Sequence, residues 1–195
     1  MTKYFSILLI LSGICFLSSG GYQLYKTTLS QHHSIKEAQQ TIDRFQISSQ
    51  KKDLKVTNFK PNQNDVVGIL FIPRIDAKLP IIEGTDPDDL EKGVGHYKSS
   101  AYPGQQNQIV LSGHRDTVFR HMGELKIGDL VTIQLPYGNF SYKIKNTKIV
   151  KADDRSIIKS TSPKEVLTIT TCYPFSYIGN APDRYIITAI PYVKH

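Results

Sequence analysis

The segment VLTITTCYPFSYIGNAPDRYIITA, from Val166 to Ala189, contains two apolar runs joined by a connection rich in Gly, Pro, Asn and Asp. This pattern is typical of neighbouring β-strands, in which side chains alternate between two faces. Leu167 and Ile169 share one face of the first run, and this face is expected to point into a core. Cys172 ends the run on the opposite, more polar face. A free cysteine is more often buried and inert, but this alternation predicts that Cys172 lies outside the core.

The second apolar run begins at Arg184, and eleven residues separate Arg184 from Cys172. We expect the two strands to lie side by side, which would bring the guanidinium close to the thiol. An arginine is a fixed cation with five donors, so it can hold a carbonyl oxygen or stabilise an oxyanion. The alternative is a structural salt bridge from Arg184 to Asp183 or Asp116.

A third polar side chain follows another apolar run, QIVLSGHRD, at residues 108–116. Val110, Ser112 and His114 share one face of the predicted strand, opposite Ile109 and Leu111. A histidine at such a strand end is usually a surface or capping residue. Opposite an outward-facing cysteine, His114 becomes a candidate general acid and base.

The remainder of the chain after residue 57 reads as short apolar runs interrupted by Gly, Pro, Asp and Asn. Seven or eight strands in about 135 residues indicate a β-barrel or a β-sandwich, with little helix. One short helix is expected at Asp86–Lys92. The predicted strands are Val67–Ile72, Lys78–Ile82, Gln108–Ser112, Leu130–Leu135, Phe140–Ile149, Val166–Thr171 and Arg184–Ile190.

The N-terminus has no charged residue between Lys3 and Lys26, a stretch of 22 positions. A membrane-spanning helix needs about 20 residues, so the stretch favours an uncleaved anchor. A cleaved signal peptide is the alternative, because small residues at 18–20 follow a short apolar core.

A second helix is predicted after the apolar stretch, because Ser34 and Glu37 have the spacing of a capping box. Four apolar side chains then fall on one helical stripe, so the helix either packs on the folded domain or stands as a stalk. These side chains are Ile35, Ala38, Ile42 and Phe45. We expect three regions: an anchor at 1–25, a helical stalk and linker at 26–57, and a β-domain at 58–195.

The net charge of +7 does not indicate nucleic-acid binding, because the surplus is unevenly placed. Residues 57–195 carry 17 Lys and Arg against 14 Asp and Glu, and the rest of the surplus lies in the first 56 residues. A basic segment next to a membrane is the favoured interpretation, and no nucleic-acid partner is expected.

The two cysteines permit neither a disulfide framework nor a zinc site, because Cys15 lies in the apolar stretch, away from Cys172. Two adjacent acids, Asp153 and Asp154, are too few for a calcium site. We therefore predict no metal.

Three segments resemble the sequence motifs of sortases. TITTCYPF resembles their cysteine segment, SGHRDTVFRHMGELKIGD their histidine segment, and APDRYIITA their arginine segment. The order of the three motifs also matches that of sortases, over roughly residues 65–192. The residues of the histidine segment are most like those of class D sortases. The resemblance implies a closed eight-stranded β-barrel with His114, Cys172 and Arg184 as the catalytic set. It also implies that Thr171 lines the oxyanion pocket through its backbone.

His96, in GVGHY, resembles a second family histidine near the site, and a structural role for it is an equal alternative. The resemblance further implies a single-pass membrane protein whose catalytic domain lies outside the cytoplasm. Its partners would be surface proteins that carry a sorting signal and an amine of the peptidoglycan.

The function implied by the resemblance is cleavage of a Leu-Pro-x-Thr-type signal and transfer of the Thr carbonyl to a cell-wall amine through a cysteine thioester. Two alternatives remain open at this point. One is a Cys–His hydrolase of peptide or cell-wall substrates, which uses water as the acceptor. The other is a membrane-tethered β-barrel binding module without catalysis. Thiol reactivity separates the binding module from both enzymes, and the choice of acceptor separates the enzymes from each other.

Overall fold

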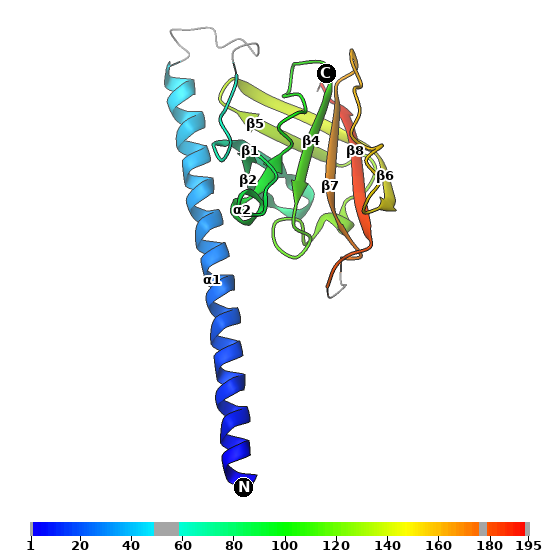
Figure 1. The fold of residues 1–195 in the computed structure, drawn as a ribbon. Coiled ribbons are helices and arrows are strands. Elements are labelled where there is room, and N and C mark those ends of the chain that lie inside the picture. The colour runs from blue at the N-terminus through cyan, green and yellow to red at the C-terminus, as the bar shows by residue number, and fades with distance from the viewer. Residues whose placement is uncertain (1, 49–58, 176–178, 194–195) are drawn as a thin grey trace.

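The computed structural model describes residues 2–48, 59–175 and 179–193. Figure 1 shows a long helix, α1 (Thr2–Ser48), that runs alongside a barrel of strands and extends well beyond it at the N-terminal end. The domain start predicted near Asn58 lies outside the described residues.

Eight strands close into a barrel in the order β1-β2-β3-β4-β7-β8-β6-β5, which confirms the expected fold class. The seven strands predicted from the sequence are all present, within two residues at either end. The strands are β1 (Val66–Ile72), β2 (Ala77–Glu83), β3 (Val94–His96), β4 (Gln108–Gly113), β5 (Leu130–Leu135), β6 (Gly138–Lys151), β7 (Val166–Tyr173) and β8 (Asp183–Pro191).

The additional strand, β3, has only three residues, one of which is Gly95, so its sequence has no alternating pattern to detect. It pairs with β2 in parallel and with β4 antiparallel. Its formation depends on these neighbours rather than on its own residues, and without it the barrel would not close.

Short helical elements connect the strands at the ends of the barrel. The expected helix forms as α2 (Pro87–Lys92), which begins with a reciprocal capping box between Asp86 and Asp89. Two single turns of 3₁₀-helix complete the set, η2 (Pro73–Ile75) and η3 (Met122–Glu124).

The barrel interior is filled by alternate residues of the strands, as the period of two requires. On β7, Leu167 and Ile169 are fully buried, and Ile109 and Leu111 are their counterparts on β4. Each such side chain contributes roughly 1.5–3 kcal/mol through its removal from water. The residues between them on β4 and β7 face the outer wall, which is where the polar strand ends were predicted.

Helix α1 is continuous through Ser34, so the predicted capping box at that position is wrong. A side chain caps a helix only where the helix begins, and no proline interrupts the chain before Ser34. Instead the helix packs on the barrel, which decides between the two placements that the sequence left open. Ala38 and Ile42 are buried against Ile69 of β1, and α1 also contacts β2 and α2.

Candidate active site

The strand register brings three polar residues to one end of the barrel. β4 and β7 are parallel with Gly113 beside Thr171, so His114 follows β4 at the level where β7 reaches Cys172. β7 and β8 are antiparallel, and Arg184 is the direct partner of Cys172 across the ladder. Adjacent strands lie about 4.8 Å apart, so this register alone places the three residues around one point.

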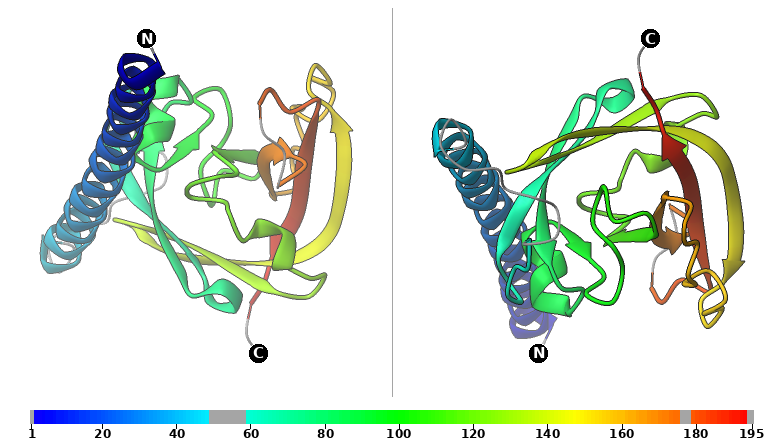
Figure 2. Two further views of the ribbon diagram at one scale, coloured as in Figure 1. Left: turned by 90° about the horizontal axis from the view of Figure 1, so that it is seen from below. Right: turned by 90° about the horizontal axis from the view of Figure 1, so that it is seen from above.

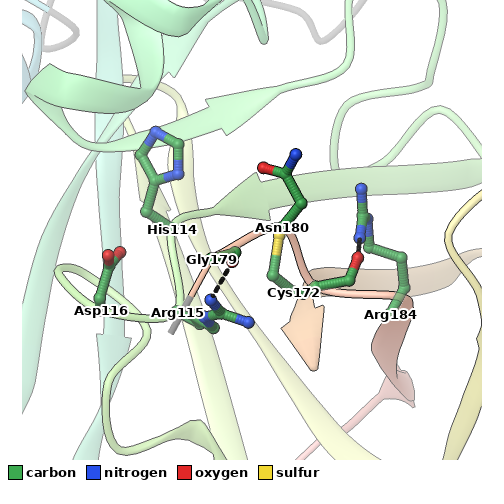
Figure 3. A pocket seen from close by; sticks show the side chains of 8 residues that line it. His114, Arg115, Asp116, Cys172, Gly179, Asn180 and Arg184 are labelled. Carbon is green, nitrogen blue, oxygen red and sulfur yellow. Dashed lines mark hydrogen bonds between the residues drawn. The ribbon is translucent and has the colours of Figure 1, made fainter. Parts of the chain in front are cut away.

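A pocket of about 310 Å³ opens at this point. Figure 3 shows the half-buried Cys172 sulfur between the His114 ring on one side and the Arg184 guanidinium on the other. The structure thus brings together the three residues selected from the sequence. The pocket is lined by His114, Arg115, Asp116, Cys172, Gly179, Asn180, Ala181 and Arg184.

Backbone carbonyls hold the Arg184 side chain in place. Its Nη1 donates to the carbonyls of Asp183, at 3.0 Å, and Ala181, at 3.3 Å. The carboxylate of Asp183 is bound instead by Lys151, at 3.1 Å. The Asp183 carboxylate thus pairs with Lys151 instead of with Arg184. The Arg184 guanidinium borders the pocket beside the Cys172 thiol.

The comparisons with known proteins agree with this geometry. The family model for the sortase domain matches residues 70–192, which is more than half of the chain. The chain belongs to the sortase family. Sortase D of Bacillus subtilis (strain 168) is 50% identical over 192 residues, covering 96% of this chain and 97% of the relative. Sortase A of Staphylococcus aureus (strain NCTC 8325 / PS 47) is 23% identical and covers 88% of this chain and 89% of the relative.

Solved structures show the same fold. A Clostridium perfringens Sortase D5 transpeptidase superimposes with a TM-score of 0.69 at 22% identity, covering 84% of this chain and 99% of that chain. Sortases are cysteine transpeptidases that act on surface proteins with sorting signals and on cell-wall substrates, and this sortase is an enzyme of that kind, most like class D. The alternative of a non-enzymatic binding module is thereby excluded.

A residue that the sequence analysis did not select, Arg115, organises the pocket of this sortase. Its side chain is 9% exposed, and it donates from Nη1 to the Pro174 carbonyl at 3.0 Å and from Nη2 to the Gly179 carbonyl at 2.8 Å. Pro174 follows Cys172 closely, and Gly179 lies on the far side of the β7–β8 connection. Arg115 thereby holds both arms of that connection. The available signal was an arginine directly after the candidate histidine, at a strand end.

We expect Arg115→Ala to lower kcat/KM for a sorting peptide by about 10- to 100-fold, because loss of two charge-assisted, part-buried hydrogen bonds costs about 1–3 kcal/mol. Arg155→Ala is the matched control, since Arg155 is exposed on the β6–β7 connection. Peptide turnover and thermal melting by circular dichroism are the measurements. Equal activity of both variants would show that Arg115 does not position the pocket.

Thr171 lies beside the pocket but points inward from it. Its side chain is 3% exposed, and its Oγ1 donates to the Gly113 carbonyl at 2.8 Å. The bond ties β7 to β4 at the residue that precedes His114. Gly113 itself admits no side chain, since a Cβ there would lie 2.6 Å from the Phe119 ring. The expected backbone role of Thr171 at the oxyanion pocket stays a prediction.

His96 is not brought to the pocket. It is 1% exposed, with Nδ1 at 2.7 Å from the Glu83 carboxylate and Nε2 at 3.0 Å from the Ala101 carbonyl. Its ring stacks on Tyr102, whose hydroxyl donates to the same carboxylate. Burial, followed by the bond to Glu83, raises the pKa of Tyr102 above its ordinary value. Both ring nitrogens of His96 have partners, which fits the structural role that the sequence left open.

Among the residues that the structure describes, no three His, Cys, Asp or Glu side chains lie close enough together to hold a metal ion. Of the two adjacent acids, Asp153 and Asp154, the second takes part in a turn: its carboxylate accepts a hydrogen bond from the Ser156 amide at 2.9 Å. Hydrogen bonding to Ser156 lowers the pKa of the Asp154 carboxyl.

Proposed function

We propose that Cys172, His114 and Arg184 are the catalytic residues of this sortase, and that they cleave a Leu-Pro-x-Thr-type signal through a thioester on Cys172. The observation that carries the proposal is the single pocket in which a thiol, an imidazole and a guanidinium meet from three adjacent strand ends. These are the groups that acyl transfer by a cysteine requires: a nucleophile, an acid and base, and a donor for the oxyanion.

In the first half-reaction the Cys172 thiolate attacks the Thr carbonyl carbon. The carbonyl oxygen takes up the negative charge, next to the guanidinium of Arg184. The C–N bond then breaks, and His114 as imidazolium gives its proton to the leaving amine. A thioester between Cys172 and the Thr carbonyl remains.

In the second half-reaction an amine of the peptidoglycan attacks the thioester carbon. His114, now neutral, removes a proton from the attacking nitrogen, and the C–S bond breaks to restore the thiolate. Neither step needs a metal or a cofactor. A hydrolase would differ only here, by using water in place of the amine.

We infer that α1 anchors the enzyme to the cell membrane. An 18-residue window of this helix has a mean hydropathy of 1.7, and none of that window is buried. On this basis residues 1–25 form a single-pass anchor, 26–57 the docked part of the helix and the linker, and 58–195 the catalytic domain outside the cytoplasm. The substrates are then surface proteins that carry a sorting signal.

Product partitioning tests the choice of acceptor. Thioesters hydrolyse slowly but react well with amines, and a groove that positions an amine gains from proximity. We therefore expect diaminopimelate-type or oligoglycine amines to raise peptide turnover and to divert the product from free acid to amide, as followed by chromatography and mass spectrometry. If every amine tried leaves free acid as the sole product at an unchanged rate, the enzyme is a hydrolase.

A further inference from the structure

Helix α1 changes its surroundings abruptly along its length. Every described side chain from Tyr4 to Tyr25 is exposed. From Thr27 onward, buried or half-buried side chains recur every three or four residues, on one stripe that faces the barrel. The stripe consists of Thr27, Ser30, Gln31, Ser34, Ile35, Ala38, Thr41 and Ile42. The apolar, exposed half of α1 therefore ends where the docked half begins.

The docking fixes the orientation of the barrel relative to α1. Ala38 is fully buried and Ile42 is 4% exposed, and both pack on Ile69 of β1 with Val66 beside them. Further contacts with β2 and α2 flank this cluster. A helix held against two strands and a second helix cannot rotate freely about a flexible joint.

The pocket lies at the end of the barrel that points along α1 toward the N-terminus. β7 runs toward that end and finishes at Tyr173, just after Cys172, whereas β8 starts there just before Arg184. In Figure 1 the β7–β8 connection lies on the side of the barrel from which the N-terminal half of α1 extends, and the C-terminus lies at the opposite end. Figure 2, seen from below, has the N-terminus and this connection on the same, nearer side.

The height of the barrel above the bilayer follows from helix geometry. Ser30 lies five positions after Tyr25, the last of the uncharged stretch, which is about 8 Å along the helix at 1.5 Å per residue. The polar headgroup layer of one leaflet is about 5–8 Å thick. Thr27, where the docked stripe begins, lies about 3 Å beyond Tyr25 on the same scale, so the docked region begins level with the headgroups.

We propose that α1 acts as a rigid bracket that holds the pocket-bearing end of the barrel against the outer surface of the bilayer, so that the enzyme acts on peptides presented at that surface. The inference rests on the membrane anchoring and the function proposed above. The partner of this end of the barrel is the lipid headgroup layer.

Distance to the membrane can be measured without catalysis. In the full chain carrying Cys15→Ser and Cys172→Ala, a nitroxide is attached at Asp116→Cys, on the pocket, or at Asn139→Cys, an exposed residue at the start of β6. The adjacent Tyr137 donates to the Pro103 carbonyl near the start of β4, which places this label at the other end of the barrel. The protein is placed in vesicles of phosphatidylcholine and phosphatidylglycerol that contain a nickel-chelating lipid. We expect several-fold stronger relaxation of the nitroxide at residue 116 than at residue 139. Equal relaxation at both positions, or the reverse order, would overturn the proposal.

Two changes in α1 then test the bracket itself. Ala38→Arg keeps a good helix former but places a charge in the docking contact, so the difference between the labels should disappear. Gln40→Arg, on an exposed face of the same helix, should leave it unchanged. Insertion of seven helical residues after Lys26 adds about 10 Å and nearly preserves the helical phase, so relaxation at residue 116 should fall while docking persists. If nitroxide relaxation at residues 116 and 139 is unchanged in both the Ala38→Arg variant and the insertion variant, α1 does not act as a bracket.

Activity separates this inference from the function on which it rests. With Cys172 intact, turnover of a soluble sorting peptide should be unaffected by Ala38→Arg or by the insertion. Turnover of a peptide tethered to the vesicle by a short spacer should fall in both. If no soluble peptide is cleaved, the proposed function fails whatever the labels report. If soluble and tethered peptides respond alike in all variants, the bracket fails and the function stands.

Discussion

Cys172→Ala is expected to reduce sorting-peptide cleavage by about four orders of magnitude or more, because no other group can form the acyl intermediate. The barrel should still fold, since Cys172 is half-buried on the outer wall and its sulfur fills no part of the core. Peptide turnover and circular dichroism together separate lost chemistry from lost structure.

Cys15→Ala is the matched control for this variant, because Cys15 is the other thiol and is exposed on the apolar half of α1. It should retain full activity in vesicles. Substantial cleavage by Cys172→Ala, or a comparable loss in Cys15→Ala, would contradict the assignment of the nucleophile.

Arg184→Lys is expected to lower kcat/KM by about 100- to 1000-fold although the positive charge is kept, a loss comparable to that of an oxyanion-hole donor. Arg184 stands directly opposite Cys172, and Nη1 is committed to the Asp183 and Ala181 carbonyls. A planar guanidinium can hold those carbonyls and still offer Nη2 to a substrate oxygen. An ammonium on a flexible stem cannot meet both demands.

Steady-state kinetics on Arg184→Lys should be compared with Arg155→Lys, in which the same exchange is made at an exposed position. The control should stay within twofold of the wild type, as surface substitutions usually do. If Arg184→Lys behaves like the control, then charge alone is sufficient and the fork geometry plays no part in the reaction.

The strands, and the positions of the candidate site residues at their ends, could be predicted because local alternation carries most of the information. On β7, Leu167 and Ile169 occupy odd positions on the buried face, and Cys172 occupies an even position on the other face. Along β4, Ile109 and Leu111 differ from His114 in the same way. The closeness of these strand ends was an expectation from the resemblance and from chain order. The register supplies it physically.

The features that were missed depend on contacts distant in the sequence. Arg115 binds carbonyls 59 and 64 residues away, and no local pattern specifies such partners. The burial of His96 depends on Glu83 and Tyr102, which reach it from other segments. The capping box at Ser34 failed for a different reason, since its spacing also occurs inside a helix and only the continuity of α1 shows that no helix begins there.

The two histidines have different surroundings, which bear on the role proposed for each. His96 is buried with partners for both ring nitrogens. His114 is half-buried on the pocket wall beside Cys172. A proton carrier must exchange protons with substrate and solvent, so the position of His114 on the pocket wall suits acid and base catalysis, whereas the buried position of His96 does not.

The most direct test of the account is to trap the acyl-enzyme and locate it. Full-length enzyme is mixed with a panel of Leu-Pro-x-Thr-type peptides and quenched in acid, and the adduct is mapped by mass spectrometry before and after an amine is added. The account predicts an adduct on Cys172 with the mass of the peptide up to its Thr residue, which the amine then removes as an amide. An adduct on any other residue, or rapid cleavage with no adduct on Cys172 at any time, would contradict it.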